Sequence, residues 1–169
     1  GDVADFTWDT ENRKLVCPSG TKRFKIYRQI SMGEGDSLEI RQYTPNESPG
    51  SDMFYGSLAF AIDGDDVYSL LYYDKSPLDR GYALAKNGTA ISGYLRISAL
   101  VSPPVKVTRN GTTAILSCDG VVGTRSITLP ETAIWVIGIR SSANASDVYS
   151  LSHIPSLSYS DDFSTDTVT

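Results

Sequence analysis

Apolar and polar residues alternate in many short segments of this chain, with the period of two that is typical of β-strands. The clearest case is Phe54–Asp74, where two apolar runs flank the acidic turn Asp63–Asp66 and predict a β-hairpin. A four-residue loop would place Ile62 opposite Val67. A three-residue loop would shift the pairing by one residue and move the side chains of the second strand to the opposite face. The sequence leaves both registers open. With the shorter loop, the core face would carry Phe54, Leu58, Phe60, Ile62, Tyr68, Leu70 and Tyr72.

Two further segments carry strong strand patterns. Ser37–Tyr43 alternates, with Leu38, Ile40 and Gln42 on one face, and predicts a half-buried strand. Ala133–Ile139 is apolar on both faces, which indicates a central strand that is covered on each side.

A second hairpin is predicted around Asn110-Gly111, because this dipeptide favours the type I′ turn that matches strand twist. Ala90–Val101 is interpreted as a strand with a kink at Gly93, in preference to a short helix. In the segment 24–30, Tyr27 is out of phase with the preceding apolar alternation. The other expected strands are 3–8, 14–17, 24–30, 82–84, 125–129 and 148–151.

About eleven short strands without a convincing amphipathic helix predict an all-β fold, a single-domain antiparallel β-sandwich or barrel with long loops. We expect this domain to span residues 1–157 and residues 158–169 to form a polar, partly disordered C-terminal tail. Three loops are expected to present polar tips at the surface, namely Pro45–Asp52, Ser76–Arg80 and Ser141–Asp147.

Composition supports a globular β-protein. The 169 residues are enough to bury roughly two thirds of the surface that the unfolded chain exposes. Apolar residues make up 40% of the chain, and its 14 glycines and 8 prolines suit many turns. The formal net charge of -5 argues against long-range attraction to nucleic acid or to anionic membranes.

One short segment of this acidic chain is basic, because it clusters four basic residues with two aromatic residues between them. A nucleic-acid-binding strand would have this pattern. We favour a strand with a solvated basic face, since the segment is short and the rest of the chain is acidic. The residues are Lys22, Arg23, Phe24, Lys25, Tyr27 and Arg28.

The sequence contains no apolar run of the length that spans a membrane, so we expect no membrane insertion. Its first residues lack the charged and apolar segments of a signal peptide. The chain begins at Gly1 without Met, and we expect it to be a processed product or a domain of a longer polypeptide.

Catalysis would have to use the one histidine, His153, as the base of a serine hydrolase, with Ser152 or Ser156 and an aspartate. The sequence has no G-x-S-x-G motif, and a histidine near a polar terminus is more often a surface residue. Dinucleotide and Walker motifs are also absent from the sequence. We therefore assign no catalytic residue and no cofactor.

No metal site is predicted. The acidic turn Asp63–Asp66 could gather oxygen ligands for calcium, but it lacks the spacing of an EF-hand, and a tight hairpin turn explains the same residues. Cys17 and Cys118 lie far apart in the chain, with no C-x-x-C motif, and could form a disulfide or be buried thiols. The sequence decides neither whether the turn binds calcium nor whether the two cysteines form a disulfide.

Tyrosine is frequent, with 10 residues, and its flat amphipathic ring suits the binding of sugars or proteins as well as the filling of a sheet. The central ones are Tyr68, Tyr72, Tyr73, Tyr82 and Tyr94. Four Asn-x-Ser/Thr triplets fall in predicted loops and could carry glycans in a secreted protein. They begin at Asn46, Asn87, Asn110 and Asn144.

The strand-like start Gly1–Trp8, the loop Pro45–Asp52 and the tail Ser158–Thr169 give the chain an organisation that resembles the protruding domain of small icosahedral RNA virus coat proteins, of the nodavirus, tetravirus and Lake Sinai virus kinds. This resemblance implies a spike domain on the virion surface that self-associates as a dimer or trimer and contacts a host receptor or glycan. Some bee-virus spike domains carry an Asp-His-Ser constellation with His directly before Ser. Here Ser152 precedes His153, so this chain departs from that pattern.

We therefore expect a non-enzymatic, surface-displayed module, a viral capsid protruding domain that mediates host attachment and contacts between capsid subunits. The alternatives are a carbohydrate-binding β-sandwich module of a secreted protein, which would be extracellular, and a hydrolase that uses His153. The sequence does not identify the binding residues.

Overall fold

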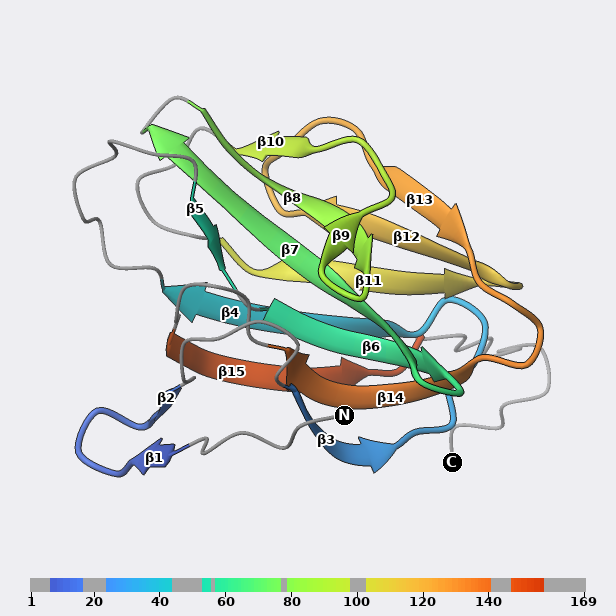
Figure 1. The fold of residues 1–169 in the computed structure, drawn as a ribbon, viewed down its shortest axis with the longest axis horizontal. Helices are drawn as coiled ribbons and strands as arrows, with labels where there is room; N and C mark the ends of the chain where they lie inside the picture. Colours follow the sequence, from blue (N-terminus) through green and yellow to red (C-terminus); the bar gives the residue numbers. More distant parts are fainter. Residues whose placement is uncertain are drawn as a thin grey trace, which may run out of the picture.

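The computed structural model describes residues 7–16, 24–43, 53–55, 57–76, 79–97, 103–140 and 147–156. These residues form fifteen β-strands, more than the eleven or so expected, and two antiparallel sheets that pack face to face (Figure 1). The predicted all-β sandwich is confirmed, and the barrel alternative is wrong. No helix of the described residues is long and apolar enough to cross a membrane.

The seven-stranded sheet has the strand order β1-β2-β15-β4-β11-β12-β13. Its strands are β1 (Thr7–Asp9), β2 (Lys14–Val16), β4 (Ser37–Tyr43), β11 (Val105–Asn110), β12 (Thr113–Cys118), β13 (Arg125–Thr128) and β15 (Asp147–Ile154).

The eight-stranded sheet has the order β10-β8-β7-β6-β14-β3, with β5 paired to β7 and β9 paired to β8. Its strands are β3 (Phe24–Gln29), β5 (Met53–Tyr55), β6 (Ser57–Asp63), β7 (Asp66–Ser76), β8 (Asp79–Lys86), β9 (Thr89–Ala90), β10 (Leu95–Ile97) and β14 (Ile134–Arg140).

The core lies between the two sheets and is built mainly from alternate residues of the strands that face it. On β4, Leu38, Ile40 and Gln42 are buried, which confirms the predicted face. Strand β14 is buried from Trp135 to Arg140 and lies between β6 and β3, which confirms the predicted central strand.

The β6–β7 hairpin contains both registers that the sequence allows. Next to the turn, Ile62 pairs with Val67, as a four-residue loop predicts. A register shift then brings Ala59 opposite Ser69, which is the register of the three-residue loop. Ile62 is half-buried, and the core cluster contains the other described members of the predicted core face, Leu58, Phe60, Tyr68, Leu70 and Tyr72.

The two Asn-Gly dipeptides occupy different positions in their hairpin turns. Between β11 and β12, Asn110 pairs with Thr113, and the two turn residues are Gly111, with a φ of 59°, and Thr112, which has no positive φ. A type I′ turn needs a positive φ at both central residues. The hairpin is therefore confirmed and its predicted turn type is wrong. The turn Asn87-Gly88 between β8 and β9 does have positive φ at both residues, 52° and 82°.

The predicted strand Ala90–Val101 is interrupted. Its first residue belongs to β9 and its middle part to β10, and residues 91–94 form no strand. The backbone amides of Ile91 and Ser92 instead both donate to the carbonyl of Leu84, at 2.8 and 3.2 Å. Pro45–Asp52, all but the last residue of Ser141–Asp147, and the tail 158–169 lie outside the described residues.

Candidate functional site

An open groove of about 690 Å³ runs between the edges of the two sheets. Strand β3 of the eight-stranded sheet forms one side, and β1 and β15 of the seven-stranded sheet form the other. Figure 1 shows β1, β2 and β3 along the same lower edge of the sandwich. We call this feature the aromatic groove; its lining residues are Trp8, Lys25, Tyr27, Arg28, Ile137, Val148, Tyr149, Ser150 and Leu151.

Strand pairing explains why Trp8 faces the groove. Trp8 on β1 is paired with Leu15 on β2, and Leu15 is paired with Val148 on β15. Directly paired residues point to the same face of a sheet, and Val148 belongs to the core. The eight-stranded sheet ends at β3. Trp8 is consequently 60% exposed, although it lies on the inward face of its sheet.

The two tyrosines of the groove both lie at β-bulges. On β3 the register with β14 shifts so that Arg28 pairs with Ile137 and Ile26 with Gly138, which leaves Tyr27 as the extra residue. On β15 the register with β4 shifts between Val148 and Ser150, which leaves Tyr149 as the extra residue. A bulge re-aims the side chain at the shift. Tyr27 and Tyr149 are 43% and 44% exposed.

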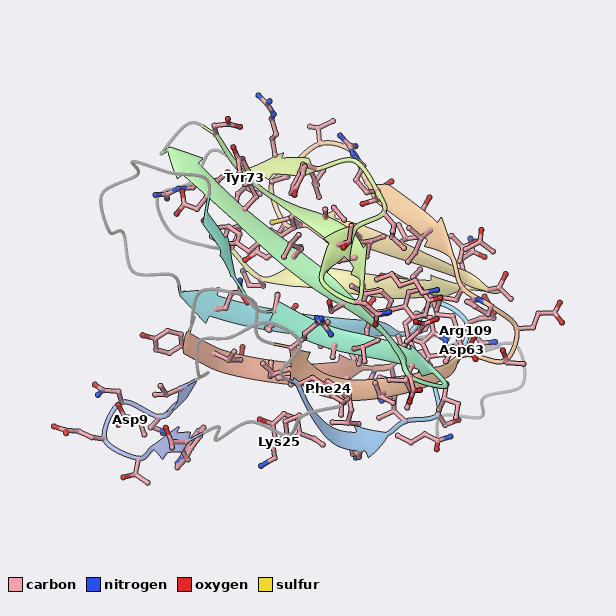
Figure 2. All side chains as sticks on the ribbon, viewed as in Figure 1. Asp9, Phe24, Lys25, Asp63, Tyr73 and Arg109 are labelled. Atoms are coloured by element: carbon pink, nitrogen blue, oxygen red, sulfur yellow. The ribbon has the colours of Figure 1, made fainter. Side chains whose placement is uncertain are left out.

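The charged side chains that line the groove are both basic. Lys25 and Arg28 come from β3, and among the described residues no acid lines the groove. The ammonium group of Lys25 lies 5.5 Å from the centre of the Tyr27 ring, which is cation–π range. In Figure 2 the side chain of Lys25 projects from β3 at the lower edge of the molecule. The predicted basic strand is therefore one side of an aromatic site.

Sequence reasoning missed this groove, because its tyrosine candidates were in the middle of the chain. One indication of the groove was present in the sequence: Tyr27 breaks the apolar alternation of its strand, and the structure has a β-bulge at this residue. Three of the candidates, Tyr68, Tyr72 and Tyr82, are at most 4% exposed and belong to the core. The rings of Tyr72 and Tyr82 lie 4.8 Å apart.

The other two candidates, Tyr73 and Tyr94, form a smaller site on the opposite side of the sandwich. Their ring centres are 5.3 Å apart. Together with Asp79, Arg80 and Arg96 they line a pocket of about 210 Å³. Burial raises the pKa of Tyr94. This pocket is small and contains both charge signs, so we regard the aromatic groove as the stronger site.

The candidate catalytic histidine has an aspartate partner. His153 Nε2 lies 3.0 Å from the carboxylate of Asp36, and both side chains are mostly buried. Asp36 also accepts the backbone amides of Ser156 at 2.7 Å and Gly33 at 2.8 Å. The hydrogen bonds from Ser156, Gly33 and then His153 lower the pKa of Asp36 from 3.8 to about 2.

A nucleophile is not part of this arrangement in the described residues. Ser152 and Ser156 are both exposed, and no serine hydroxyl there is hydrogen-bonded to His153. Ser156 contributes its backbone amide to Asp36. The Asp36–His153 contact connects the turn before β4 to the end of β15, which is a structural role.

The acidic turn Asp63–Asp66, the calcium candidate of the sequence, has protein partners. Asp63 accepts a hydrogen bond from Thr132 at 2.9 Å. Asp66 forms an ion pair with Lys86 at 2.7 Å and accepts the side-chain amide of Asn87 at 2.7 Å. In the part of the chain that the structure describes, no group of three or more His, Cys, Asp or Glu residues could hold a metal ion.

The cysteines and glycan triplets are partly described. Cys118 is a free, buried thiol whose pKa is raised to about 11 by burial and by Asp119. Asn87 uses its side chain inside the protein, because its oxygen accepts the backbone amide of Val67 at 2.9 Å. Asn110 is exposed. Cys17, Asn46 and Asn144 lie outside the described residues.

Comparison with known proteins identifies no relative, since no protein-family model, no curated protein and no solved structure matches the chain. Its class is therefore defined by the fold, an antiparallel β-sandwich.

Proposed function

We propose that this protein is a non-enzymatic recognition module that is displayed on a larger assembly and binds its target through the aromatic groove. The supporting observation is that three exposed aromatic side chains from three strands share one groove of about 690 Å³. Scattered apolar residues are normal on a protein surface, but a cluster of them marks an interaction site.

The groove has the properties of a binding site for a ligand of limited size. Its volume lies within the roughly 300–1,000 Å³ of small-molecule sites. Trp and Tyr rings offer a large rigid contact area and lose few rotamers when a ligand binds. Trp8, Tyr27 and Tyr149 line the groove together with the buried apolar residues Ile137 and Val148.

The larger assembly that we propose is a small icosahedral virus capsid, with this chain as its protruding domain on the virion surface. The sequence organisation described above supports this context, as does a rigid sandwich that exposes its binding groove along one edge. Such a domain attaches the particle to a host receptor or glycan and self-associates as a dimer or trimer.

Attachment can be tested with labelled protein on candidate host cells by flow cytometry. We expect Trp8→Ala and Tyr149→Ala to abolish most of the cell-bound signal. Val122→Ala is the matched control, because Val122 is 99% exposed and lies outside the groove. Equal binding by the groove variants and the wild type would refute the proposed role of the groove.

The capsid context needs its own measurement, because a carbohydrate-binding module of a secreted protein could use the same groove. Light scattering on the purified chain should give a dimer or trimer if it is a spike. A strictly monomeric chain at the concentration found in a particle would favour the secreted module.

The Asp36–His153 pair favours a hydrolase as the second candidate. An ester hydrolysis assay on the wild type and on His153→Ala tests it. Hydrolysis that depends on His153 would replace the recognition proposal with an enzymatic one.

A further inference from the structure

We infer that the ligand of the aromatic groove is an acidic saccharide, a sugar that carries a carboxylate or sulfate group. This inference rests on the proposed function, since it names the ligand of the same groove. Its basis is the combination of exposed ring faces with two basic side chains in one site.

The charge in the groove is the reverse of the charge of the chain. The chain as a whole carries -5, whereas Lys25 and Arg28 are the charged residues that line the groove. Neither has an ion-pair partner among the described residues, whereas Arg80, Lys86, Arg96, Lys106 and Arg109 do. Unpaired basic side chains beside apolar rings favour a ligand that brings its own negative charge.

The arrangement of rings and charges also matches a sugar. A pyranose ring has an apolar face of C–H groups that packs against an aromatic ring, and Trp8 and Tyr149 present such rings on the β1 and β15 side. Lys25 and Arg28 come from β3 on the other side. The contact between Lys25 and the Tyr27 ring restrains the ammonium group beside the groove. A ligand that stacks on one side would thus meet a positive charge on the other.

Other anionic ligands fit less well. A nucleic acid needs a long basic surface, and the net charge of -5 opposes it beyond the groove. An acidic peptide has fewer flat faces to place against the three exposed rings. The size of the groove suits a ligand of a few linked rings.

Calorimetric titration with three soluble probes tests the inference: a sialylated trisaccharide, a sulfated heparin oligosaccharide, and neutral lactose. We expect one of the acidic probes to bind at least about tenfold more tightly than lactose, and the identity of that probe distinguishes a carboxylate from a sulfate ligand. The double variant Lys25→Ala, Arg28→Ala should lower this affinity about tenfold or more. Trp8→Ala should lower it as well.

Two controls separate charge from folding. Arg125→Ala removes a positive charge on β13, at the far edge of the seven-stranded sheet, and should bind like the wild type. The double variant Lys25→Arg, Arg28→Lys preserves both charges and should retain most of the affinity. Loss of affinity in this variant together with a lowered melting temperature would attribute the effect of the alanines to structure and would overturn the inference.

Cell binding distinguishes failure of this inference from failure of the proposed function. If sialidase and heparinase treatment of the cells and the double alanine variant all leave binding intact, while Trp8→Ala abolishes it, the groove binds a non-acidic ligand or a protein. The inference is then wrong and the proposed function stands. If Trp8→Ala also binds normally, both are wrong.

Discussion

The imidazole of His153 on β15 lies within hydrogen-bond distance, 3.0 Å, of the carboxylate of Asp36 in the turn before β4, across 117 positions of the chain. Asp36 also accepts the backbone amide of Ser156, which follows β15 directly. The carboxylate thereby joins β15, the last strand of the described residues, to the turn before β4. Because β15 also carries Tyr149, this connection helps to fix one side of the aromatic groove.

The first prediction is an acid-sensitive loss of stability through Asp36. Its pKa is about 2 in the folded protein, below the 3.8 of an unperturbed aspartate, so the unfolded chain binds more protons between these values. The stabilisation by Asp36 is therefore fully present above about pH 4 and is lost as the pH falls towards 2. Urea unfolding at pH 6 and pH 2.5 should show a smaller loss of stability for Asp36→Asn than for the wild type.

Ser156→Ala is the matched control for this measurement. Ser156 donates its backbone amide to Asp36, so removal of the hydroxyl should leave the acid dependence as in the wild type. An Asp36→Asn protein that loses as much stability in acid as the wild type would contradict the assigned role of Asp36.

A second prediction concerns the close approach of β14 and β3. A Cβ atom on Gly138 would lie 2.4 Å from the carbonyl oxygen of Lys25 and 3.0 Å from Cα of Ile26. Both are backbone atoms, so Gly138→Ala should force the strands apart and cost about 1–3 kcal/mol in chemical denaturation. In contrast, Gly93→Ala would meet only the flexible side chain of Arg125 and should cost much less.

The same substitution should also affect binding. Gly138 adjoins the bulge that aims Tyr27 into the aromatic groove. We therefore expect Gly138→Ala to weaken attachment even below its unfolding temperature. Attachment equal to that of the wild type would separate the bulge from the function of the groove.

A third prediction compares a core tyrosine, Tyr72, with a tyrosine of the smaller pocket, Tyr94. Tyr72 is 1% exposed and packs against Tyr82 in the core, so Tyr72→Ala should lower the free energy of unfolding by about 3–5 kcal/mol. Tyr94→Ala removes a partly exposed ring next to Tyr73 and should cost clearly less. Thermal unfolding of both variants is the test, and equal losses would contradict the assignment of Tyr72 to the core.

A fourth prediction concerns the two described glycan triplets. The amide of Asn87 is bonded to Asp66 and Val67, whereas Asn110 is exposed. When the protein is expressed through a secretory pathway, we expect mass spectrometry to find a glycan on Asn110 and none on Asn87. Asn87→Ala should also cost about 1–3 kcal/mol, because it leaves the amide of Val67 without its acceptor. A folded protein with a glycan on Asn87 would contradict this prediction.

The sequence was sufficient for strands whose pattern is local. The alternation of Leu38, Ile40 and Gln42 and the continuous apolar run of β14 both identified their strands correctly. The turn at Gly111 was mispredicted in type, because a one-residue difference in pairing decides which residues occupy the centre of a turn. The sequence could not decide the β6–β7 register, because the hairpin uses one register next to the turn and the other beyond the bulge.

The candidate site could not be predicted for a different reason. Trp8 and Tyr149 are 141 positions apart in the sequence and line the same groove because β2 and β15 are neighbours in the sheet. Strand order is a long-range property that apolar periodicity does not contain. The acidic partner of His153 was undetermined for the same reason, since many aspartates were available and only the fold selects Asp36.

The exposed inward face of β1 has a thermodynamic consequence. Among the described residues the eight-stranded sheet ends at β3, and the ring of Trp8 on the inward face of β1 is 60% exposed. A ligand in the groove would cover this exposed face. Ligand binding would then bury apolar surface of the folded protein and stabilise it against unfolding. A true ligand should accordingly raise the melting temperature, and the amino-terminal hairpin should gain the most protection from hydrogen exchange.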